Sequence, residues 1–142
     1  MHPDRMRGRT APVLVLSLVT LVLAAGCGDK QSNVLNPAFQ PEVMNNIDSF
    51  QFQATNVTNL NQILTYTWRN TGTQANVDQS SSITAGTATL SLRDSTGAQV
   101  YTRSLTEGGS LASGVGLAGN WTIRVTLTGV RGTLNFRVQK KT

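Results

Sequence analysis

The strongest constraint on this chain is a period-two alternation of apolar and polar residues that recurs between residues 50 and 139. It is clearest in 121–128, where Trp121, Ile123 and Val125 alternate with polar residues. Alternate side chains of a β-strand point to opposite faces, so such a segment buries one face and exposes the other. The pattern therefore predicts β-strands, and no stretch after residue 27 shows the 3.6-residue period of a helix.

The same alternation occurs in several other segments, and turn-forming residues separate them. The alternating segments are 50–54, 64–69, 88–93, 99–105 and 134–139, and a shorter, more polar run at 75–77 is predicted to be an edge strand. Turns are predicted at 94–97 and 129–132, and a glycine-rich loop at 106–119. We expect an all-β fold: an antiparallel β-sandwich, jelly-roll-like or immunoglobulin-like, of about seven or eight short strands.

The composition supports this fold class. Only 13% of the 142 residues are charged, about half of the usual share near 25%. Most of the polarity comes from uncharged Thr, Ser, Asn and Gln, which favour strands and turns over helices. These features argue against a coiled coil, a helical bundle and an acidic disordered chain.

The first residues have the layout of an export signal. Arg5, Arg7 and Arg9 precede an apolar run over 11–25 that carries no charge. This run is shorter than the roughly 20 residues that a membrane-spanning helix needs, and it ends in small residues. The layout predicts a cleaved signal peptide over 1–26.

The end of this segment, Leu23-Ala24-Ala25-Gly26-Cys27, resembles the lipobox of bacterial lipoprotein precursors. The resemblance implies a diacylglycerol on the Cys27 thiol, cleavage before Cys27, and acylation of the new amino terminus. Two or more acyl chains anchor a protein stably to a membrane. The residue after the cysteine is Gly28 rather than Asp, and the resemblance to Gram-negative lipoproteins implies that this favours the outer membrane, if the source has one. The alternative is an ordinary signal peptide followed by a free thiol.

The remaining chain divides into two parts. Residues 27–46 are polar, contain Pro37 and Pro41, and are predicted to form a lipidated cysteine with a flexible tether. Residues 47–142 are predicted to form the sandwich domain. Residues 27–142 keep only a mild charge of +3 of the formal net +5. We therefore expect no nucleic acid among the partners, which are instead a membrane, anionic envelope polymers or another envelope protein.

The sequence lacks the residues that most kinds of catalytic site require. The single histidine, His2, lies in the signal segment, so the mature chain would have no Ser–His–Asp triad and no His/Cys zinc site. No glycine motif for phosphate binding opens a helix. We therefore expect no catalytic residue, no cofactor and no metal. Two minor alternatives remain, a structural calcium ion and a hydrolase with paired carboxylates, and the candidate carboxylates are Asp48, Asp78, Asp94 and Glu107.

Four arginines fall on the polar phase of their predicted strands: Arg69, Arg93, Arg124 and Arg137. If these strands belong to one sheet, the arginines form a basic stripe that contacts anionic envelope polymers or lipid head groups. The alternative is a solvated face that keeps the protein soluble. Trp68 and Trp121 are in phase with the apolar residues, which predicts core positions rather than a platform for sugar rings.

The segment Gly119–Val125 (GNWTIRV), followed by Gly132–Phe136 (GTLNF), resembles the closing hairpin of jelly-roll domains such as the P-domain of convertases. The resemblance implies a sandwich fold and assigns no functional residue. The sequence thus favours a small lipid-anchored envelope protein with a binding or structural role. The alternatives are a carbohydrate- or ligand-binding module of a larger envelope assembly and a carboxylate-dependent hydrolase.

Overall fold

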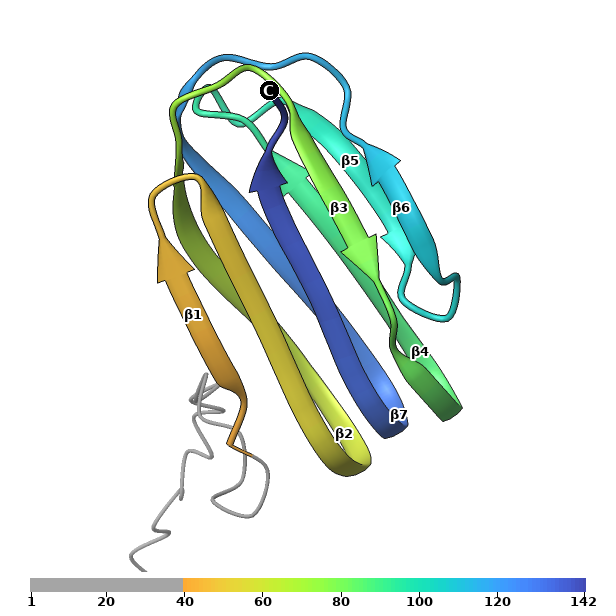
Figure 1. Cartoon of the computed structure of the whole chain (residues 1–142). Coiled ribbons are helices and arrows are strands. Elements are labelled where there is room, and N and C mark those ends of the chain that lie inside the picture. Colours follow the sequence, from red (N-terminus) through yellow and green to blue (C-terminus); the bar gives the residue numbers. More distant parts are fainter. Residues whose placement is uncertain (1–39) are drawn as a thin grey trace, which may run out of the picture. The chain divides into compact units, whose positions relative to one another are not determined.

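The computed structural model describes residues 40–142, and all regular structure in this range is β-strand (Figure 1). The predicted all-β antiparallel sandwich is confirmed. Its seven strands are β1 (Glu42–Asn46), β2 (Ser49–Asn70), β3 (Ala75–Gln79), β4 (Ser82–Arg93), β5 (Gln99–Ser104), β6 (Gly109–Ala112) and β7 (Gly119–Lys140).

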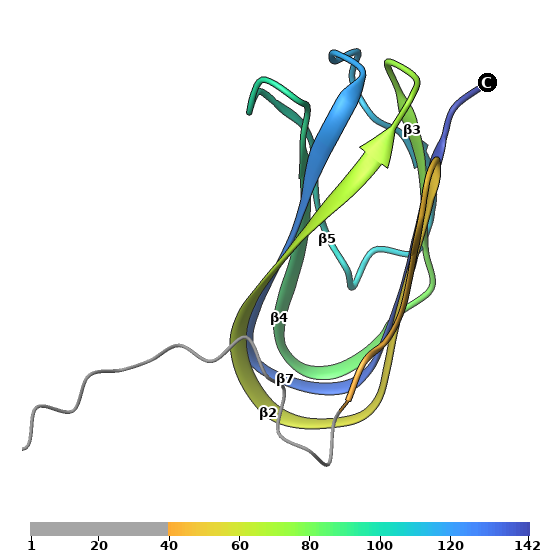
Figure 2. The same ribbon diagram turned by 90° about the vertical axis from the view of Figure 1, so that its left-hand side faces the viewer.

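Two long strands, β2 and β7, run through both layers of the sandwich. In the layer that we call layer A, residues 49–54 of β2 lie between β1 and β7, and residues 136–140 of β7 pair with β3, which in turn pairs with β6. In layer B, residues 62–70 of β2 pair with the first half of β7, which pairs with β4, and β4 pairs with β5. Figure 2 shows β2, β4 and β7 curving together from one layer into the other.

The curve is a corner built from β-bulges and residues with positive φ. The register of β2 shifts three times between Ala54 and Gln62, and Asn56 and Asn59 have φ of 55° and 49°. A bulge bends its strand and increases the local twist, which lets one strand serve two layers. On β7, a Cβ atom at Gly132 would overlap the backbone carbonyl of Ser82, so this corner requires glycine.

The corner corrects the interpretation of residues 129–132 as a turn. Gly132 has φ of 124°, but the chain continues in the same strand, so 119–140 is one bent strand and not a hairpin. For the same reason 50–54 and 64–69 belong to one strand. A chain reversal and a strand corner both use Asn and Gly at positive φ, so local sequence does not distinguish them.

Three smaller differences concern the margins of the predicted strands. β3 was predicted to be an edge strand but lies between β7 and β6. β6 lies inside the segment 106–119, which was expected to be loop throughout. β1 extends the sheet into the segment 27–46, which was expected to be tether. In contrast, the hairpin around 94–97 is confirmed, and Gly97 has φ of 88°.

The core lies between the two layers and is rich in aromatic rings. Trp68 and Trp121 are both 0% exposed and meet edge to face, with ring centroids 5.9 Å apart. The ring of Phe50 in layer A packs against that of Tyr66 in layer B, with ring centroids 5.2 Å apart, so the two layers are in direct contact. Each indole N–H donates to a backbone carbonyl, so neither tryptophan buries an unpaired donor.

The end opposite the corner is formed by loops that hydrogen-bond to one another. The Asp48 N–H donates to the Arg69 carbonyl, and the Gly116 N–H donates to the Thr73 carbonyl. The C-terminal end of β7 lies at this loop end as well (Figure 1). The chain enters the sandwich at the other end, because Glu42 pairs with Gln53 beside the corner. Within residues 40–142 no helix is suited to cross a bilayer.

Candidate functional site

Three of the four predicted arginines lie on the outer face of layer B. Arg124 of β7 lies between Thr65 of β2 and Ser91 of β4, and Arg93 of β4 pairs with Thr122. Arg93 and Arg124 are therefore diagonal neighbours, about 7–8 Å apart. Arg69 pairs with Asn120. It therefore lies two strands away from Arg93 and two residues further along the sheet, a separation of about 12 Å. We call this surface the arginine face.

The positions between these arginines are mostly hydroxyl side chains. They belong to the outward phase of all four strands of layer B: Thr65, Thr67, Thr87, Thr89, Ser91, Thr102, Ser104, Thr122, Thr126 and Thr128. Threonine is favoured on a pleated surface, and its hydroxyl both donates and accepts hydrogen bonds. The arginine face thus combines positive charge with many neutral polar groups.

Among the described residues, the arginine face contains no carboxylate. All three arginine side chains belong to exposed residues, and no salt bridge among residues 40–142 includes Arg69, Arg93 or Arg124. The Arg93 guanidinium donates to the Gly97 carbonyl at 2.9 Å, which orients it without neutralising it. The face therefore keeps its positive charge available for an anionic ligand.

Arg137 does not belong to this group. It lies on the outer face of layer A, where its Nη2 is 3.2 Å from Oδ2 of Asp78. Asp78 also accepts a hydrogen bond from Ser110, and this bond, followed by Arg137, holds the pKa of Asp78 below its usual value. The structure thus separates the predicted stripe into three arginines on one face, without an ion-pair partner among residues 40–142, and one ion-paired arginine on the other.

The other candidate carboxylates each have separate partners. The Thr71 N–H and Lys140 keep the pKa of Asp48 at about 2, and Lys140 Nζ lies 2.9 Å from the carboxylate. Asp94 accepts from the Thr96 hydroxyl, the Leu117 N–H and other groups of its turn, which also keeps its pKa at about 2.

Glu107 is also occupied, because it pairs with Arg103 at 2.8 Å. No hydrogen bond joins two of the four candidate carboxylates in the described part of the chain. Residues 40–142 also bring together no group of three or more His, Cys, Asp and Glu side chains suited to a metal ion.

Both tryptophans are in the core, as the sequence predicted, so neither offers an exposed ring to a sugar. Cys27, the predicted lipidation site, lies outside the described residues.

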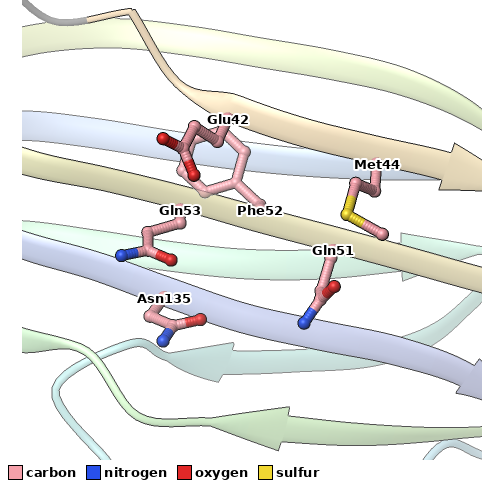
Figure 3. Close-up of a pocket in the computed structure, with 6 residues that line it drawn as sticks. All are labelled: Glu42, Met44, Gln51, Phe52, Gln53 and Asn135. Atoms are coloured by element: carbon pink, nitrogen blue, oxygen red, sulfur yellow. The ribbon is translucent and has the colours of Figure 1, made fainter.

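A second polar surface was not predicted from the sequence. On the outer face of layer A, Glu42, Gln53 and Asn135 form one row across β1, β2 and β7, and Met44 and Gln51 lie beside them. Together with Phe52, these residues line a shallow pocket of about 130 Å³ (Figure 3). Alternating Gln residues at 51 and 53 were the available signal, but the pairing with β1 and β7 was not evident.

No protein-family model matches the chain, and no curated protein matches it either.

Proposed function

We propose that this chain is a small lipid-anchored protein of the bacterial cell envelope that binds an anionic polymer and catalyses no reaction. The observation that carries the proposal is the arginine face, where three exposed guanidinium groups have no carboxylate partner among the described residues. Guanidinium groups bind phosphate and carboxylate through two parallel hydrogen bonds. The surrounding hydroxyls supply further donors to the same ligand.

The envelope location rests on the amino-terminal sequence. An apolar run followed by Cys27 in a lipobox-like context supports lipidation at that cysteine. Residues 28–41 would then connect the lipid to β1, with a reach of about 50 Å when fully extended. Because β1 begins beside the corner, the arginine face would lie along the side of the tethered domain and remain accessible to polymers near the membrane.

Lipidation is tested with a Cys27→Ser variant in a bacterial host. Metabolic labelling with palmitate should mark the wild-type protein and not the variant, because serine lacks the thiol that receives the diacylglycerol. Membrane fractionation of the two proteins should show the variant released from the membrane. Equal labelling of both proteins would contradict lipidation at Cys27.

Polymer binding is tested with a variant that carries Arg69→Gln, Arg93→Gln and Arg124→Gln. Exposed charge pairs contribute about 0.2–1 kcal/mol each, so losing three should weaken binding to long-chain polyphosphate by about tenfold. Fluorescence anisotropy or calorimetry measures the affinity. Added salt should weaken wild-type binding, because it screens exposed charges.

The matched control changes three basic residues outside the arginine face: Arg131→Gln, Arg137→Gln and Lys141→Gln. Both triple variants lose the same net charge. A larger loss of affinity in the arginine-face variant would therefore show that the position of the charges matters and not the net charge alone. Equal losses in the two variants would contradict the assignment to the arginine face. A parallel titration with phosphatidylglycerol vesicles distinguishes sources of phosphate: binding to vesicles but not to polyphosphate would replace the polymer with a membrane surface.

A further inference from the structure

We propose that the pocket on the outer face of layer A binds a neutral, hydroxyl-rich ligand, namely a segment of a carbohydrate chain. The pocket faces away from the arginine face and offers a different chemistry, so the proposal adds a second binding site to the proposed function. It is lined by side chains from three neighbouring strands (Figure 3). Three features of these side chains support such a ligand: their spacing, their hydrogen-bonding groups without partners among the described residues, and the charge of the face.

The spacing comes from the strand register. Glu42, Gln53 and Asn135 are direct cross-strand neighbours, and Met44 and Gln51 form the adjacent pair. Outward side chains on adjacent strands are about 5 Å apart, and those two residues apart along a strand are about 7 Å apart. The pocket is therefore a small, regular array of polar side chains with the dimensions of one or two sugar rings.

The polar groups of this array have no hydrogen-bond or ion-pair partner within the described part of the protein. No hydrogen bond or ion pair there involves the carboxamide groups of Gln51, Gln53 and Asn135 or the carboxylate of Glu42. Each carboxamide offers two N–H donors and one carbonyl acceptor, and the carboxylate accepts from hydroxyls. Vicinal sugar hydroxyls present a donor and an acceptor side by side, which is the arrangement that a carboxamide complements.

An apolar contact is also present at the pocket. Met44 is 59% exposed, and Figure 3 shows its thioether beside Gln51. A methionine side chain is flexible and polarisable, so it adapts to the C–H face of a sugar ring. In this pocket Met44 would provide the apolar contact with the sugar ring, since Trp68 and Trp121 are both buried and offer no exposed aromatic ring.

The charge of the face selects a neutral ligand over an anionic one. The nearest cation, Arg137, is paired with Asp78, and Glu42 adds a carboxylate without an ion-pair partner among residues 40–142. An anionic polymer gains no attraction from this surface, whereas a neutral glycan needs no charge. The two outer faces would thus bind different parts of an envelope, or different groups on one polymer.

The experiment is an NMR titration of the isotope-labelled full chain with a panel of neutral oligosaccharides, composed of glucose, xylose, mannose and N-acetylglucosamine oligomers. At least one oligomer should shift the side-chain NH₂ signals of Gln51, Gln53 and Asn135, and high salt should leave the affinity unchanged. If no oligomer of the panel shifts these signals, the proposal is wrong.

Variants then test the residues. Gln53→Ala should weaken binding of the identified oligomer by about tenfold, as expected for the loss of one or two hydrogen bonds. Asn76→Ala is the matched control, because Asn76 is exposed on the same face of β3 but outside the pocket. Equal effects of the two variants would contradict the site.

Discussion

The two outer faces of the sandwich share the strands β2 and β7 yet carry different chemistry. On layer B the outward positions are mainly threonine and serine around three arginines that have no ion-pair partner among residues 40–142, whereas on layer A they are mainly carboxamides around one ion-paired arginine. Arg124 and Arg137 lie on the same strand and both point outward, but only Arg137 has a carboxylate opposite it on the neighbouring strand. Cross-strand neighbours therefore decide which arginines remain available.

The largest expected effect tests whether the two faces depend on a single core. Trp121→Ala should destabilise the domain by about 3–5 kcal/mol, because it removes a fully buried ring that packs on Trp68. Since β2 and β7 pass through both layers, both faces should unfold together. Chemical denaturation followed separately by Trp68 fluorescence and by NMR signals of layer A measures this, and two distinct transitions would show that the layers are independent.

A smaller effect tests the role of the partner of Arg137. Asp78→Asn removes the carboxylate that neutralises Arg137, so layer A gains one unpaired cation. Polyphosphate should then bind about twofold more tightly, because one exposed charge contributes little. An Asp48→Asn variant serves as the control, since it frees Lys140 at the loop end instead. A gain of the same size in both variants would show that only net charge matters.

Part of this architecture was predictable from the sequence. Period-two alternation predicted the all-β class and the inward phase of Trp68, Trp121, Ile123 and Val125, because burial of one face follows directly from the pleat. The turn at 94–97 was also predictable, since Gly97 takes a positive φ there. These features depend on local sequence alone.

The remaining features depend on contacts between distant segments. The positions of Asn56, Asn59 and Gly132 are compatible with a turn, and only the pairing of β2 with β7 makes them a corner. Likewise, the sequence places Arg137 in phase with the other arginines, and only the neighbouring strand β3 reveals Asp78 opposite it. The pocket of layer A also arises from pairing, because Glu42 and Asn135 are far apart in the chain.

In the wild-type domain we expect the arginine face, rather than layer A, to bind anionic polymer. The most direct test is an NMR titration of the full chain with polyphosphate at low salt. We expect localised shifts of backbone amides at Thr65, Thr122 and Arg124, with the carboxamide signals of Gln51 and Gln53 unchanged. Shifts centred on layer A, or equal shifts on both faces, would contradict it.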